Sequence, residues 1–190
     1  MSIKIPAGIS ARHIHVSRED LDVLFGKDYQ LTLVKDLSQP GQYVSAERVD
    51  LVTEKGTFKN VSILGPIRKQ TQVEISLTDA LKLGLKPPVR DSGNLEGSPG
   101  LTLVGPKGEV KLTEGVIAAC RHIHMTPEDA EKIGVKDKEI VKVKVGGERG
   151  LIFDQVLCRV HETFKLDMHL DTDEANAAKV QNGDLVELIK

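Results

Sequence analysis

Apolar and polar residues alternate in short runs along most of the chain, and glycine- and proline-containing turns separate these runs. Because successive strand residues point to opposite faces, such runs predict half-buried β-strands. The predicted strands are Leu31–Val34, Val49–Thr53, Val61–Ile63, Gln72–Ser76, Leu101–Val104, Val116–Cys120, Glu139–Val145, Gln155–Val160, Phe164–His169 and Leu185–Ile189. Many short strands with few helices favour small β-barrels.

Four short helices are predicted between these strands, each about two turns long and therefore dependent on tertiary packing. The residues expected to cap them are Ser17, Thr78, Thr126 and Thr172. Asp20 and Asp129 lie three residues after their caps, as in an acidic capping box. Pro127 occupies a first helical position, where no N–H is needed.

An internal repeat divides the chain. Residues 12–20 read RHIHVSRED and residues 121–129 read RHIHMTPED, an offset of 109 residues. We therefore expect two halves of similar design, 1–90 and 91–190, each with one His-x-His motif, their boundary in the turn-rich stretch Pro87–Gly100. The predicted fold is mainly β: two small β-barrel domains with short capping helices, with exchange of strands between the halves allowed.

The composition excludes several classes of function. Hydrophobic residues make up 39% and charged residues 28% of the 190 residues, which is typical of a globular protein. With 3% aromatic residues and a net charge of −2, nucleic-acid and anionic-membrane partners are not expected. No apolar run approaches the ~18–20 residues of a membrane span, and no secretory signal is recognised. Two cysteines make no disulfide framework, so a cytoplasmic location is expected.

The paired histidines of the repeat are candidate metal ligands. In an extended segment His13 and His15 project from one face, and so do His122 and His124. Neutral imidazole suits zinc, and a matched second copy makes metal binding a stronger interpretation than two polar surface pairs. His169 is a fifth candidate.

Other residues have competing interpretations. Glu74, taken alone, reads as the solvent face of a half-buried strand. Cys120 shares strand parity with the second pair and is either a ligand or, more in keeping with its size, a small buried residue. We expect Cys158 in the core and His161 at the surface.

An arginine offers a candidate anion site. Arg68 follows a Gly-Pro turn six residues before Glu74, and its guanidinium fork suits phosphate, although alone it reads as a surface residue beside Lys69. Arg12 and Arg121 are expected to pair with carboxylates such as Asp20 or Asp129, or to contact anions. No Walker A loop, GxGxxG fingerprint or Gly-x-Ser-x-Gly elbow occurs, so metal-assisted chemistry is favoured.

The two RHIH segments, GPIRKQTQVE (residues 65–74) and HLDTDEANA (residues 169–177) resemble the PduL-type phosphotransacylases, or phosphate propanoyltransferases, from about Ile5 to Ile189. The resemblance implies two β-barrels with a pair of zinc ions, and reversible transfer of a propanoyl or acetyl group between coenzyme A and phosphate, as in propanediol degradation. The metal ligands that it implies are His13, His15, Glu74, His122, His124 and His169. It also implies that Arg68 binds phosphate.

Six ligands shared between two zinc ions, three each, would leave open positions, as catalytic zinc requires. Members housed in bacterial microcompartments carry an N-terminal targeting extension, for which the 12 residues before His13 have no room. The expectation is either a free cytoplasmic protein or a luminal one whose extension is missing from this sequence. A homo-oligomer is compatible with the sequence.

Direct transfer from thioester to phosphate is the expected mechanism, with a covalent intermediate on Cys120 as the alternative. Two rival functions are a zinc hydrolase or thioesterase and a non-catalytic structural-zinc module. A His-x-His-x-Asp-His hydrolase motif is absent, because Ser17 and Arg18 follow the first pair. No motif distinguishes propanoyl from acetyl groups, which differ by one methylene.

Overall fold

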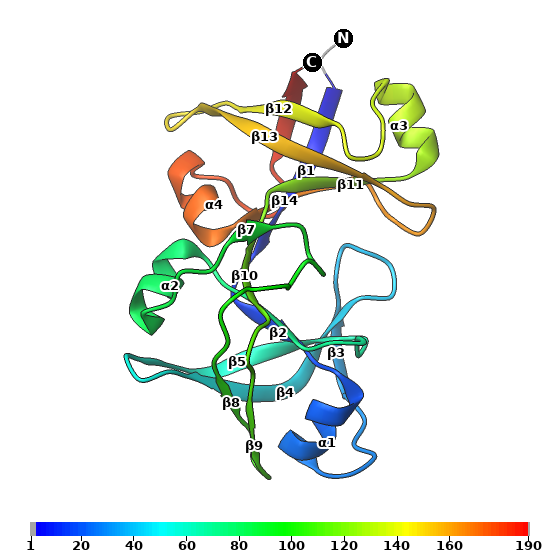
Figure 1. Ribbon diagram of the computed structural model, residues 1–190. Coiled ribbons are helices and arrows are strands. Elements are labelled where there is room, and N and C mark those ends of the chain that lie inside the picture. The colour runs from blue at the N-terminus through cyan, green and yellow to red at the C-terminus, as the bar shows by residue number, and fades with distance from the viewer. Residues whose placement is uncertain (1–2, 190) are drawn as a thin grey trace. The chain divides into compact units, whose positions relative to one another are not determined.

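The computed structural model describes residues 3–189 (Figure 1). Most of the regular secondary structure in these residues is β-strand. Strands account for 43% and helices for 16% of the residues, so the predicted mainly β fold with short helices is confirmed. The chain forms two compact units. Unit 1 contains the described residues 3–11, 38–40 and 120–189, and unit 2 contains Arg12–Leu37 and Gly41–Ala119.

Unit 1 is a closed six-stranded barrel in the order β1-β14-β11-β13-β12-β15. Its strands are β1 (Ile3–Ser10), β11 (His122–Met125), β12 (Ile140–Val145), β13 (Leu151–Val160), β14 (Asp167–Asp171) and β15 (Leu185–Ile189). β1, blue in Figure 1, closes the barrel because it pairs in parallel with β14 and antiparallel with β15, drawn in red. In β12 the Val-Lys alternation buries Val141, Val143 and Val145 and exposes the lysines between them.

Unit 2 is built on a nine-stranded sheet that curls into a half-barrel. The order is β7-β10-β6-β2-β5-β4-β8-β9, with β3 paired to β4. Its strands are β2 (His13–His15), β3 (Leu33–Asp36), β4 (Tyr43–Val52), β5 (Thr57–Gly65), β6 (Gln72–Glu74), β7 (Val89–Arg90), β8 (Thr102–Val104), β9 (Glu109–Lys111) and β10 (Val116–Ala119). Aliphatic side chains such as Ile14, Leu51, Ile63 and Leu103 fill its core.

Four helices lie within residues 3–189: α1 (Arg18–Phe25), α2 (Leu77–Leu83), α3 (Pro127–Ile133) and α4 (Thr172–Ala178). The predicted caps Ser17 and Thr126 are confirmed, and Thr126 forms a capping box with Asp129. The predictions for the other two caps were wrong. Ser76 caps α2 and Asp171 caps α4, so Thr78 and Thr172 lie inside their helices. At each helix both the predicted and the observed residue have a side chain that can cap a helix. The one with extended backbone just before the first helical turn is the cap.

At α1 the expected capping box is modified by Thr71, the residue that precedes β6. The Ser17 side chain accepts a hydrogen bond from the Asp20 amide at 3.1 Å. The Ser17 amide donates to Thr71 Oγ1 at 2.9 Å, and the Thr71 hydroxyl in turn donates to the Asp20 carboxylate. Thr71 therefore relays the interaction that a capping box makes directly.

The compact units do not coincide with the expected halves, 1–90 and 91–190. Unit 2 continues to Ala119, and the N-terminal strand belongs to the unit that contains the C-terminal strands. β1 was not predicted, because Pro6 and Gly8 interrupt its alternation. None of the helices within residues 3–189 is long and apolar enough to span a membrane.

Candidate metal centres

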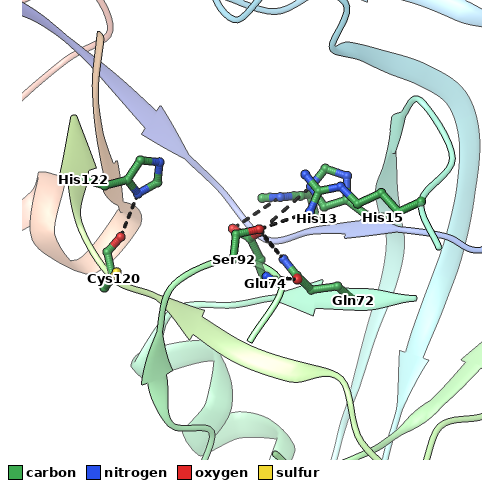
Figure 2. Close-up of polar contacts among 9 residues, drawn as sticks. His13, His15, Gln72, Glu74, Ser92, Cys120 and His122 are labelled. Carbon is green, nitrogen blue, oxygen red and sulfur yellow. Dashed lines mark hydrogen bonds and ion pairs between the residues drawn. The ribbon is translucent and has the colours of Figure 1, made fainter. Parts of the chain in front are cut away.

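Three predicted ligands meet in unit 2. The side chain of Ile14 is fully buried in the core, so the alternation of β2 turns His13 and His15 to the other face. β6 runs antiparallel to β2 and places Glu74 opposite His13. The Nε2 atom of His13 lies 3.5 Å from Glu74 Oε2, and Nε2 of His15 lies 4.0 Å from Oε1 (Figure 2).

The other three predicted ligands meet in unit 1 with the same construction. Ile123 is buried in the barrel core, and its neighbours His122 and His124 face away from it. β14 runs antiparallel to β11 and places His169 opposite His122. In each unit the three ligand atoms lie within 4.8 Å of one another. The six residues singled out in the sequence therefore form two groups of three, one per unit.

Hydrogen bonds orient two of the ligands in unit 1. His122 Nδ1 lies 2.8 Å from the Cys120 carbonyl oxygen (Figure 2). A carbonyl oxygen can only accept a hydrogen bond, so Nδ1 carries the proton, and the lone pair available to a metal is on Nε2. His169 Nε2 lies 3.1 Å from Asp167 Oδ2, which leaves Nδ1 as its ligand atom. Bonds of this kind fix the tautomer of metal-binding histidines.

The surroundings of two candidate ligands in unit 2, His15 and Glu74, favour the protonation states that bind metals. Burial, together with the nearby positive charge of Arg68, lowers the pKa of His15 well below its ordinary value, so the imidazole is neutral. Burial raises the pKa of Glu74, but the hydrogen bond with His13 and the positive charge of Arg68 act in the opposite direction, and the pKa is lowered overall. The carboxylate is therefore ionised.

Two imidazoles with one carboxylate, and three imidazoles, are both donor sets of catalytic zinc sites. Three protein ligands leave a coordination position for water or substrate. The residues of both groups thus fit the predicted metal, although the assignment of the six as zinc ligands stays a prediction.

Arg68 is linked to the unit 2 group by one hydroxyl. Its backbone amide donates to Val16 at 2.9 Å, which holds the segment after β5 against the chain that leaves β2. Its Nη1 donates to Ser92 Oγ at 3.1 Å, and the Ser92 hydroxyl donates to Glu74 Oε1 at 3.1 Å. A guanidinium thus lies two hydrogen bonds from a metal-ligand candidate.

Gln72 completes this network. Its Nε2 donates to Glu74 Oε1 at 2.5 Å and to Ser92 Oγ at 2.8 Å, while its Oε1 accepts from the Gly93 amide at 2.8 Å (Figure 2). Oε1 of Glu74 is held by two protein donors, and Oε2 is the oxygen nearest His13.

The structure extends the internal repeat to a second segment. Gln72, Glu74 and Asp79 correspond to Asp167, His169 and Glu174, at an offset of 95 residues. In each unit the arginine before the first histidine binds an acidic residue in the helix that follows the third ligand candidate, α2 in unit 2 and α4 in unit 1. This acidic residue is the third residue of its helix. Arg12 binds Asp79 through two 2.8 Å hydrogen bonds, and Arg121 binds Glu174 at 2.7 Å.

Carboxylate pairing of these arginines was predicted, but the named partners were wrong. Asp20 and Asp129 each lie at the third position of the helix that directly follows the histidines, and they bond there to Thr71 and to the Thr126 cap. The partners come instead from α2 and α4, which follow the strands of the third ligands.

Sequence reasoning missed Gln72, Ser92 and Asp167. Gln72 and Asp167 each lie two residues before a third ligand on the same strand face, and this parity was the available signal. No local pattern marks Ser92, which lies in a turn-rich segment. As predicted, Cys158 is fully buried and His161 is exposed. Cys120 is half-buried, and its carbonyl rather than its thiol contacts His122.

The chain is similar to one family of known proteins over most of its length. The phosphate propanoyltransferase family matches residues 6–181. Phosphate propanoyltransferase of Thermotoga maritima is 60% identical over 187 residues, covering 98% of this chain and 89% of the relative. The enzymes of the same name from Clostridioides difficile and Listeria monocytogenes are 56% and 55% identical, each over 95% of this chain and over 87% and 85% of the relatives. This chain belongs to the phosphate propanoyltransferase family and is an acyltransferase.

Proposed function

We propose that this enzyme interconverts propanoyl-CoA and phosphate with propanoyl phosphate and CoA, using two zinc ions per chain. The observation that carries the proposal is the position of Arg68, joined through the single hydroxyl of Ser92 to Glu74. An anion-binding side chain beside a metal-ligand group suits a reaction between phosphate and a carbonyl compound. Acetyl-CoA, one methylene shorter, is the second substrate to compare.

One zinc ion would be held by His13, His15 and Glu74, and the other by His122, His124 and His169. When bound, zinc supplies a Lewis acid that stabilises developing negative charge on oxygen. The protein holds these ligands ready by burial and by the hydrogen bonds of Gln72, Ser92, Cys120 and Asp167.

Arg68 binds phosphate in this proposal. A guanidinium carries five N–H donors in a fixed fork that matches two phosphate oxygens. One of them, on Nη1, is engaged by Ser92, which fixes the direction of the side chain. Holding phosphate at a set position beside the thioester supplies proximity, an effect that reaches ~7–11 kcal/mol in well-oriented reactions.

The proposed chemistry is a direct transfer. A phosphate oxygen forms a bond to the thioester carbonyl carbon, the C–S bond breaks, and CoA leaves as the thiolate with the bonding electrons before taking a proton from solvent. The reverse reaction retraces these steps. No protein nucleophile is needed, so the Cys120 thiol has no role in this scheme.

The first prediction tests the reaction class. With propanoyl-CoA, release of CoA should require phosphate, and propanoyl phosphate should form in equal amount and be trapped as the hydroxamate. Arsenate should replace phosphate and yield free propanoate, because water hydrolyses the mixed anhydride propanoyl arsenate to propanoate and arsenate. A thiol reagent measures CoA in each reaction.

The same assay separates the rival functions. Equal CoA release with and without phosphate would identify a thioesterase and disprove the transferase proposal. A kcat/KM series over acetyl-, propanoyl- and butanoyl-CoA then gives the preferred acyl group, with ~1–3 kcal/mol expected per methylene in a fitted pocket.

A further inference from the structure

The residue two positions before the third ligand makes the same contact in both units. Gln72 precedes Glu74 on β6 and donates to its Oε1 at 2.5 Å. Asp167 precedes His169 on β14, and its Oδ2 lies 3.1 Å from His169 Nε2. The two positions also pair with equivalent residues, since Gln72 lies opposite His15 and Asp167 opposite His124.

The chemistry of each pair is reversed between the units. In unit 2 the third ligand is a carboxylate and its supporting residue is a neutral amide. In unit 1 the third ligand is an imidazole and its supporting residue is a carboxylate. Each centre therefore combines the two imidazoles of its His-x-His motif with one carboxylate. This carboxylate is the third ligand in unit 2 and the supporting residue in unit 1. The Asp167 carboxylate is nearly buried, with 8% of its side chain exposed, so solvent screens its charge only weakly.

Neither supporting residue can be exchanged for the other without cost. A carboxylate at position 72 would lie against the Glu74 carboxylate and repel it. It would also lack the N–H that donates a hydrogen bond to Glu74. An amide at position 167 would still accept the His169 proton but would bring no charge. The backbone also makes room for the pair in unit 1. A Cβ at Gly8, which lies opposite His169 on β1, would come within 3.2 Å of Asp167 Oδ2 and 3.3 Å of His169 Cδ2.

We propose that Gln72 and Asp167 are equivalent positioning residues, and that the choice of side chain at these two positions gives each zinc centre one carboxylate. Both residues orient the third ligand of their centre. The carboxylate is itself a ligand in unit 2, and in unit 1 it is hydrogen-bonded to the third ligand. A consequence is that His169 presents Nδ1 to its metal. This inference rests on the proposed binding of one zinc ion by each group.

The experiment isolates one centre at a time. In His13→Ala only the unit 1 centre stays complete, and in His122→Ala only the unit 2 centre does. Zinc affinity is measured by competition with a chromophoric chelator, and Co²⁺ substitution reports the ligand environment by its absorption spectrum. Thermal unfolding of the metal-free proteins checks that each variant is folded.

Asp167→Asn keeps the shape and the acceptor but removes the charge. In the His13→Ala background it should weaken zinc binding about 10- to 100-fold, and in the His122→Ala background it should change nothing. Gln72→Ala should show the opposite dependence on background. Glu148→Gln is the matched charge control, because Glu148 is an exposed residue of unit 1 paired with Lys179.

The outcomes separate this inference from the proposed function. Wild-type protein that retains no zinc would overturn the two-zinc proposal itself. Wild-type protein with two zinc ions, together with Asp167→Asn that binds as tightly as its parent in the His13→Ala background, would overturn the role of Asp167 alone. Equal weakening by Glu148→Gln would show a general charge effect and would also overturn it.

Discussion

At the scale of single residues, the Ser92 hydroxyl is fully used. It accepts hydrogen bonds from Arg68 Nη1 and Gln72 Nε2 and donates its proton to Glu74 Oε1. A hydroxyl offers one proton and two lone pairs, so these three partners fix its orientation. The position of the guanidinium and the orientation of the Glu74 carboxylate, a proposed metal ligand, therefore depend on the same small side chain.

The role of Arg68 in phosphate binding is tested by Arg68→Lys, which keeps the positive charge but loses the fork. A charge-assisted hydrogen bond contributes about 1.5–3 kcal/mol, so the KM for phosphate should rise roughly 10- to 100-fold. The zinc content should not change, because Arg68 is not a ligand. Steady-state rates at varied phosphate and elemental analysis measure the two effects.

Ser92→Ala provides the comparison, since it removes the link to Arg68 and one of the donors to Glu74. It should affect both the phosphate KM and zinc affinity, whereas Arg68→Lys affects the first alone. If the phosphate dependence of Arg68→Lys equals that of the wild-type enzyme, Arg68 is a surface residue without a role in binding.

At the scale of elements, each centre is built from an antiparallel strand pair followed by a short helix. The strands β2 and β6, and β11 and β14, bring the ligands together by register. The helix after the third ligand then places an acidic residue against the arginine that precedes the first histidine. The arginine and the helix thereby hold the two strands of each centre in register from outside the ligand set.

Removing this connection in unit 2 is expected to destabilise the fold. Asp79 has a nearly buried side chain and binds both Nε and Nη2 of Arg12, whose guanidinium also lies 4.3 Å from the Phe58 ring. Asp79→Asn should lower the free energy of unfolding by about 1.5–3 kcal/mol, because it weakens hydrogen bonds to a charged group at a buried site. Urea unfolding followed by circular dichroism measures the loss.

The control is Glu128→Gln, which breaks the exposed ion pair between Glu128 and Lys132 in α3. Exposed pairs of this spacing contribute ~0.3–0.5 kcal/mol, so the change should be small. Equal losses in the two variants would contradict a structural role for the Arg12–Asp79 pair.

The sequence predicts those features that depend on local alternation and on the repeat. The two histidine pairs follow from strand parity and the RHIH motif, and the caps Ser17 and Thr126 follow from local chemistry. Glu74 required the family resemblance, because one acidic residue on a strand is ordinarily solvent-facing. The supporting roles of Gln72 and Asp167 depend on which residue each side chain meets, and Ser92 comes from a distant turn. The missed strand β1 is stabilised by partners near the other end of the chain rather than by its own pattern.

At the scale of the whole molecule, the two units have separate cores, and Cys158 belongs to the closed barrel of unit 1. Burial, and to a smaller extent the charges of Glu139 and Asp137, raises the pKa of its thiol to about 11 from an ordinary value of 9.0. The folded barrel therefore keeps the proton over a range of pH in which an unfolded chain has lost it.

This difference predicts that the barrel loses stability between about pH 9 and pH 11. There the native state binds more protons than the unfolded state, and the free energy of unfolding falls as pH rises. Urea unfolding of the wild type and of Cys158→Ala at pH 8 and pH 10.5 tests it. The drop between the two values should be smaller in the variant, since the titrating thiol is gone, and an identical drop in both proteins would refute the contribution of Cys158.

The closure of the barrel by β1 has a consequence for protein synthesis. β1 ends at Ser10, whereas its partner β15 begins only at Leu185. A ribosome adding about 5–20 residues per second would need roughly 9 to 35 s to translate the chain between them. During that time the intervening unit 2 can fold, whereas β1 lacks β15 as a partner and its backbone groups on that side are hydrogen-bonded to water.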